Sequence, residues 1–257
     1  MPSQKSYKKI VVKIGSSLFA AGKNKLDMAL VNNLAGQIAI LVKQGKEVVV
    51  VSSGAIALGM SILKLTQRPK ELRQLQAVAA IGQHELMHVY KLALARCGLN
   101  CAQVLLTWDD FSKKRYGNAK NTINTILKFK ALPIINENDT VATEEIKFGD
   151  NDKLSALVAI LLDADLLVIL SDVDGLLDKN KQVIGVVGKI NGQIKSLACS
   201  TNKKICVGGM ITKLEAARMV IAAGIPCVIA NGSKFGIINA VVASPFKSGT
   251  IFLPVKK

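Results

Sequence analysis

Aromatic residues are scarce in this sequence, where they make up only 4% of 257 residues and include one tryptophan. Proteins that bind single-stranded nucleic acid without sequence preference stack bases on aromatic side chains, so this composition disfavours that class. The net charge is +16, but the basic residues are scattered and no nucleic-acid-binding motif is recognisable. A nucleic-acid partner is therefore the weaker hypothesis, and a basic surface suits small anionic substrates.

Long apolar runs are also missing. The longest, residues 154–162, is far shorter than the roughly 20 residues that cross a bilayer. The N-terminal segment MPSQKSYKK is polar and lacks the apolar centre of a signal peptide. We therefore expect a cytoplasmic protein with no membrane partner.

Several sequence signatures are absent. The five cysteines are odd in number and contain no C-x-x-C pair, which favours free thiols over a disulfide framework or a zinc ribbon. The P-loop, the G-x-G-x-x-G dinucleotide fingerprint and the protein-kinase signatures do not occur. The two histidines, His84 and His88, match H-E-x-x-H, but so short a pattern arises easily by chance. A solvated or core-edge helix face is the better interpretation, and no metal ligand is predicted.

What the chain does contain is a regular alternation of apolar patterns. Short β-branched runs predict strands at residues 8–14, 48–51, 104–106, 132–135, 166–170 and 227–230, with a short last one at 251–253. Between them, helical periodicity predicts helices at residues 27–44, 69–96, 118–130, 152–162 and 210–223. This alternation predicts an α/β fold, a three-layer αβα sandwich around a mostly parallel central sheet.

Small and polar residues follow four of the predicted strands, at residues 13–17 (KIGSS), 52–54 (SSG), 136–139 (NEND) and 171–172 (SD). Ligands of open parallel sheets bind outside the carboxyl ends of the strands, so the four clusters together predict one site. The third cluster begins an acid-rich stretch, residues 136–152, that ends with Asn151 and Asp152 at a predicted helix start. The alternative for this stretch is a solvated surface loop.

The same residues suggest phosphate chemistry. Gly15 allows the backbone to approach a ligand, and Lys13 at the end of a buried strand is costly unless it meets an anion or extends to solvent. Residues 208–213 (GGMITK) open a helix, and a helix N-terminus with Lys213 in its first turn attracts anions. Two lysines with a carboxylate such as Asp152 between them would clamp a transferring phosphoryl group.

Five motifs resemble the glutamate 5-kinase family of the amino-acid kinase superfamily: VVKIGSS (11–17), SSGAIALG (52–59), INENDTVATEEIKFGDNDKLSALVA (135–159), SDVDGL (171–176) and GGMITKLEAA (208–217). The resemblance covers essentially the whole chain. It implies transfer of the ATP γ-phosphate to the side-chain carboxylate of L-glutamate, for proline synthesis, with ATP and Mg²⁺, a homo-oligomer (dimer or tetramer) and inhibition by proline. It also implies a single domain, with the substrate in about residues 1–165 and the nucleotide in about 166–257, and no C-terminal PUA domain.

The resemblance assigns roles residue by residue. It implies that Lys13 and Lys213 stabilise the phosphoryl group while Asp152 orients them, and that Ser53, Asp139 and Asn151 bind glutamate. Nucleotide binding is implied for Lys13, Ser171, Asp172, Val207, Gly208, Gly209, Met210, Ile211, Thr212 and Lys213.

The chain departs from the family at Val207, where a hydroxyl is usual, at Leu177, where tyrosine is usual, and in its short segment 179–189. We expect these departures to affect the affinity for the nucleotide and not the type of reaction. Two alternatives stay open: a kinase for another small anion, such as N-acetylglutamate, aspartate or UMP, and a catalytically silent, basic RNA-binding or regulatory protein.

Overall fold

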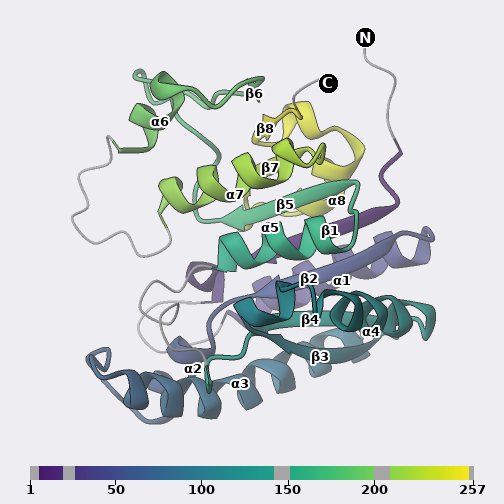
Figure 1. Ribbon diagram of the computed structural model, residues 1–257, viewed down its shortest axis with the longest axis vertical. Coiled ribbons are helices and arrows are strands. Elements are labelled where there is room, and N and C mark those ends of the chain that lie inside the picture. Colours follow the sequence, from purple (N-terminus) through teal and green to yellow (C-terminus); the bar gives the residue numbers. More distant parts are fainter. Residues whose placement is uncertain (1–5, 20–26, 142–150, 200–208, 255–257) are drawn as a thin grey trace.

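Runs of valine, isoleucine and leucine form the centre of the molecule, because such side chains favour strands that are covered on both faces. The computed structural model describes residues 6–19, 27–141, 151–199 and 209–254 (Figure 1). In this part of the chain the strands are β1 (Lys9–Ile14), β2 (Glu47–Ser52), β3 (Asn100–Leu106), β4 (Ala131–Glu137), β5 (Leu166–Ser171), β6 (Val186–Val187), β7 (Cys227–Asn231) and β8 (Thr250–Phe252). They form one sheet in the order β3-β4-β2-β1-β5-β7-β8-β6, in which β7 and β8 are antiparallel and the other pairs parallel.

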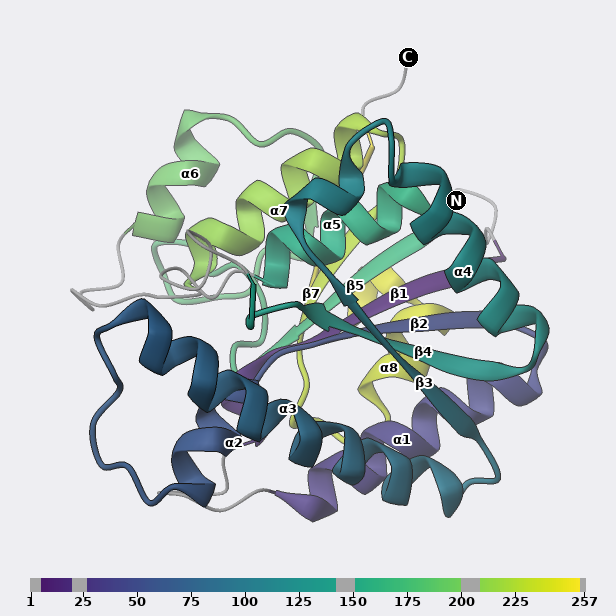
Figure 2. The same cartoon turned by 60° about the horizontal axis from the view of Figure 1, so that its bottom comes forward.

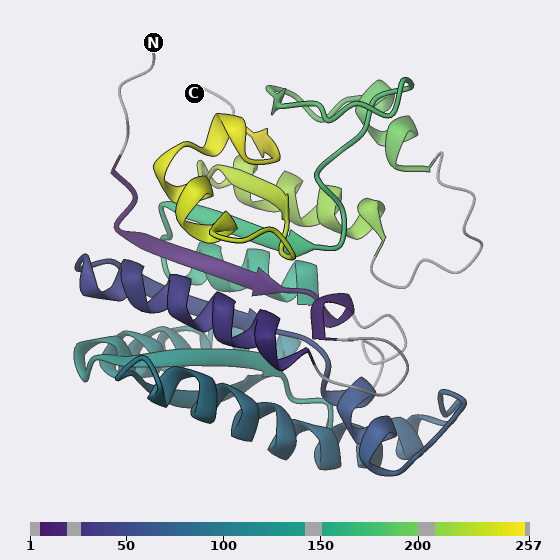
Figure 3. The same cartoon turned by 180° about the vertical axis from the view of Figure 1, so that it is seen from behind.

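Helices cover both faces of this sheet, as Figures 2 and 3 show from two sides. The described helices are α1 (Met28–Lys43), α2 (Ala55–Ile62), α3 (Leu72–Ala95), α4 (Tyr116–Lys128), α5 (Asn151–Leu161), α6 (Gly192–Cys199), α7 (Met210–Ala222) and α8 (Ile237–Ala243). No helix in the described ranges is both long and apolar enough to cross a membrane.

The alternation of side chains along β1 divides the core into two layers. Ile10, Val12 and Ile14 pack in one core cluster with residues of α1, α3 and α8. Val11 packs in the other, with residues of α4, α5, α6 and α7. The predicted αβα sandwich with a mostly parallel sheet is confirmed.

Most predicted elements lie within a few residues of the observed ones, and the differences have local causes. β3 starts at Asn100, four residues before the predicted strand. Its first six positions are exposed or half-buried, so the sequence there lacks the long apolar run that would predict a strand. α3 starts at Leu72 with Glu71 as its N-cap, so Pro69 lies in the preceding loop and does not open the helix. The short strand β6 and the short helices α2, α6 and α8 were not predicted.

Two glycines bring α2 and α3 into backbone contact. A Cβ atom at Gly82 would lie 1.8 Å from the carbonyl oxygen of Ala55, and one at Gly59 would lie 1.9 Å from that of Val78. Any larger side chain would therefore push the two helices apart. This packing fixes the start of α2, which directly follows the Ser52-Ser53-Gly54 loop.

Candidate active site

Three charged side chains from β1, α5 and α7 meet on one side of the sheet. Lys13 lies on the same face of β1 as Val11, which directs it toward α5 and α7. Its Nζ is 2.6 Å from Asp152 Oδ1, and the Nζ of Lys213 is 3.2 Å from Asp152 Oδ2. The side chains of Lys13, Asp152 and Lys213 are 8%, 1% and 5% exposed. Two buried ammonium groups around one carboxylate leave an excess positive charge, which suits an anionic ligand.

Asp152 is held in its ionised form. Burial by itself would raise the pKa of its carboxyl group, but the ammonium groups of Lys13 and Lys213 hold that pKa below its usual value. The hydroxyl of Thr212 also donates to Asp152 Oδ2 at 2.8 Å. The carboxylate is therefore charged at neutral pH and keeps both lysines in position.

A chain of side-chain amides joins the neighbouring strand ends. Asn151, the first residue of α5, donates from Nδ2 to the backbone oxygen of Ser52 at 2.6 Å and to Oδ1 of Asn136 at 2.7 Å. Asn136 in turn donates to Oε1 of Gln83 on α3 at 2.8 Å. Because Asn136 and Asn151 are buried, these bonds fix the ends of β2 and β4 against α5.

A cavity of about 260 Å³ opens at the carboxyl ends of β1, β2, β4 and β5. Residues from all four predicted strand-end clusters line it, among them Lys13, Ser53, Asn136 and Ser171. The turn after β1 is tied to β5, since the amide of Gly15 donates to the carbonyl oxygen of Leu170 at 3.1 Å. The four clusters thus line one cavity.

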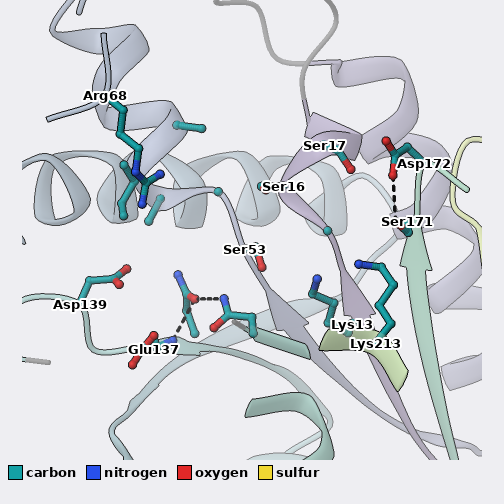
Figure 4. A pocket seen from close by; sticks show the side chains of 17 residues that line it. Lys13, Ser16, Ser17, Ser53, Arg68, Glu137, Asp139, Ser171, Asp172 and Lys213 are labelled. Atoms are coloured by element: carbon teal, nitrogen blue, oxygen red, sulfur yellow. Dashed lines mark hydrogen bonds between the residues drawn. The ribbon is translucent and has the colours of Figure 1, made fainter. Parts of the chain in front are cut away.

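The ends of the cavity differ in character (Figure 4). Lys13 and Lys213 lie side by side near Ser171 and Asp172, and Ser171 Oγ donates to Asp172 Oδ1 at 3.0 Å. Beyond Ser53, the cavity is lined by Arg68, Glu137 and Asp139. Burial raises the pKa of the Asp139 carboxyl to about 6, against a smaller opposing effect of Arg68. One end of the cavity is therefore lined by two lysines and suits a phosphate group, whereas the other end carries both positive and negative charges.

The histidine pattern takes no part in this site. His84 and His88 are exposed on α3, as a solvated helix face requires. Among the described residues, no group of three or more His, Cys, Asp and Glu side chains could hold a metal ion.

Comparison with known proteins gives this geometry a family. The amino acid kinase family matches residues 8–231, which is most of the chain. The chain belongs to the amino acid kinase family. A curated glutamate 5-kinase of Caldanaerobacter subterraneus subsp. tengcongensis is 46% identical over 96% of this chain and 68% of its own length. The glutamate 5-kinase of Geobacter metallireducens is 44% identical over 98% of this chain and 69% of its own length. The predicted resemblance to glutamate 5-kinases is confirmed.

Solved structures agree with the amino acid kinase fold. N-acetylglutamate synthase from Neisseria gonorrhoeae, complexed with coenzyme A and N-acetyl-glutamate, superposes with a TM-score of 0.71 at 15% sequence identity. The match covers 97% of this chain and 60% of that protein. Likeness at this level of identity concerns the fold alone.

The structure brings most of the predicted residues of this amino acid kinase together. The cavity is lined by the predicted residues Lys13, Ser53, Asp139, Asn151, Ser171, Asp172 and Lys213. Asp152 lies behind the two lysines, and Thr212 holds it, whereas Ile211 is 47% exposed at the start of α7. Gly209 and Met210 form the N-cap and first residue of α7. Val207, Gly208 and the middle of the acid-rich stretch lie outside the described residues. The roles of all these residues remain predictions.

Arg68 and Gln83 are polar residues at the site that were not predicted. Arg68 lies in the loop between α2 and α3, and nothing local distinguishes it from the basic residues around it. Gln83 directly precedes His84 on α3 and is half-buried. Its role could be predicted only if it were already known which face of α3 packs toward the site.

Proposed function

We propose that this protein transfers the γ-phosphoryl group of ATP to the side-chain carboxylate of L-glutamate, giving L-glutamyl 5-phosphate for proline synthesis. The observation that carries the proposal is the buried cluster of Lys13, Asp152 and Lys213, two of whose members line the cavity. Similarity to glutamate 5-kinases over 96% of the chain supports this reaction.

The protein needs to contribute little covalent chemistry to this reaction. The acceptor carboxylate has a pKa of about 4.3 and is ionised at neutral pH, so no general base is needed. One of its oxygens bonds to the γ-phosphorus while the bond from that phosphorus to the β,γ-bridging oxygen breaks, and ADP leaves with the electron pair. Lys13 and Lys213 neutralise the charge of the transferring group, and Asp152 holds them in place.

We assign the two substrates to the two ends of the cavity. The nucleotide phosphates belong near Ser171, Asp172 and the start of α7, where the two lysines lie. Glutamate belongs near Ser53, Asp139 and Asn151, with its γ-carboxylate toward the lysines. Residues up to about 165 would then carry the acceptor and residues 166–257 the nucleotide.

Magnesium is assigned to the bound nucleotide. Mg²⁺ usually binds phosphate oxygens and keeps several waters, so it needs few protein ligands. Bound there, it would neutralise phosphate charge. Inhibition by proline, a homo-oligomeric state and a cytoplasmic location complete the proposal, on the resemblance alone.

A hydroxamate assay tests the reaction, because hydroxylamine traps an acyl phosphate. With ATP and Mg²⁺ we expect the product from L-glutamate, and much less from aspartate or N-acetylglutamate. Equal product from either of those acceptors would mean a different amino acid kinase. Absence of any product would favour the silent-protein alternative. Repeating the assay with proline tests the inhibition, and light scattering after gel filtration tests the oligomer.

A further inference from the structure

The glutamate end of the cavity contains a cation that the proposed chemistry does not yet use. Arg68 lines the cavity from the loop between α2 and α3. Figure 4 shows its guanidinium on the same side of Ser53 as Asp139, away from Lys13 and Lys213. The cavity therefore has cations at two separate places.

The positive charge of Arg68 is available to an anionic ligand. In the described part of the chain, no carboxylate forms a salt bridge with it. Its charge nevertheless reaches into the site, because it lowers the pKa of Asp139 against the larger effect of burial. By contrast Arg73, five residues along the chain, is paired with Glu71 at 2.8 Å, has an 84% exposed side chain and does not line the cavity.

The chemistry of the proposed acceptor suits such a cation. When the γ-carboxylate of glutamate lies at the lysines, its other end presents an ammonium group and a second carboxylate. Asp139 and Glu137 suit the ammonium group, since carboxylates accept its hydrogen bonds. Neither suits the α-carboxylate, which like charges repel. A guanidinium binds a carboxylate through two parallel hydrogen bonds.

We propose that Arg68 binds the α-carboxylate of the acceptor and thereby selects amino acids with a free α-carboxylate. This inference rests on the proposed function, and it deepens the account of the same site. It makes Arg68 a specificity-determining residue whose contribution is to binding, because it lies away from the transferring phosphoryl group.

The test compares glutamate with 4-aminobutyrate, which is glutamate without its α-carboxylate. In Arg68→Ala we expect kcat/KM for glutamate to fall by about 10- to 100-fold, the size of a charge-assisted hydrogen bond. The loss should lie in KM, with kcat nearly unchanged. The inhibition constant of 4-aminobutyrate against glutamate should not rise, because that ligand has no α-carboxylate for Arg68 to bind. Arg68→Lys should recover part of the glutamate affinity, and Arg73→Ala should behave as wild type.

Three results would overturn the inference. One is an unchanged glutamate KM in Arg68→Ala. Another is equal weakening of glutamate and 4-aminobutyrate, as expected if Arg68 only shaped the loop. The third is a similar loss in Arg73→Ala, which would indicate a general charge effect. Failure of the proposed function is a separate result, since the wild-type protein would then make no acyl phosphate from glutamate.

Discussion

Replacing Asp152 with asparagine tests the centre of the site most directly. The substitution keeps the shape of the side chain but removes the negative charge that lies 2.6 Å from Lys13 Nζ and 3.2 Å from Lys213 Nζ. Two buried ammonium groups then face each other without a counter-ion. Breaking a buried ion pair in this way costs about 3–5 kcal/mol, so we expect a marked fall in unfolding free energy.

We expect Asp152→Asn to change kcat much more than it changes the KM for glutamate. Without Asp152 the lysines lose their fixed positions relative to the transferring phosphoryl group, and the loss of one such electrostatic element lowers kcat by about 10²- to 10³-fold. The KM for glutamate should change little, because Asp152 lies behind the lysines and does not line the cavity. Steady-state kinetics with a coupled ADP assay separates the two constants.

A matched control is available on the same two helices. Lys153 and Glu215 also join α5 to α7, at 2.8 Å, but their side chains are 37% and 43% exposed. Glu215→Gln should therefore cost less than about 1 kcal/mol and leave kcat unchanged. If Asp152→Asn resembles this control in both stability and kcat, the lysine clamp is wrong.

The pH dependence gives an independent check. The pKa of Asp152 is lowered in the folded protein from its usual 3.8. The group therefore contributes stability that is fully present above that value and is lost as the pH falls through the lower folded-state pKa. The stability difference between wild type and Asp152→Asn should stay constant from neutral pH down to about 5 and shrink in stronger acid.

Three further predictions concern the rest of the site. Because burial raises the pKa of Asp139 to about 6, kcat/KM for glutamate should fall below that pH as the carboxyl group becomes protonated, and Asp139→Asn should raise KM and flatten this limb of the profile. Gly82→Ala would set a Cβ 1.8 Å from a carbonyl oxygen of α2, so we expect the unfolding free energy, measured by thermal unfolding, to fall by about 1–3 kcal/mol. Gly36→Ala, where a Cβ would meet nothing within 4 Å, should leave the unfolding free energy unchanged or raise it. Gln83→Leu removes the acceptor for the Asn136 amide, and we expect a several-fold higher glutamate KM with little change in the KM for ATP. An unchanged profile, equal melting temperatures or an unchanged glutamate KM would contradict these three in turn.

The amino-acid sequence alone predicts most of the longer elements of this fold and the chemical character of the candidate site. Strands and helices follow from apolar periodicity over a few residues, which is why β1, β5 and α7 lie close to their predicted bounds. The clusters at the strand ends are also local features, because each one directly follows its strand. Lys13 was predicted from its position at the end of a buried run, and the structure brings it to Asp152 and Lys213.

Other contacts of the site follow only from the folded arrangement of the chain. Asn151 reaches the backbone of Ser52, 99 residues away, and Asn136 reaches Gln83, 53 residues away. Such contacts depend on strand order and on the close packing of α2 against α3, and a local pattern records neither. Arg68 is the clearest example, because its sequence context is that of an ordinary basic loop residue and only the fold places it at the cavity. Local sequence sets what each segment can form, whereas the sum of long-range packing sets where its side chains act.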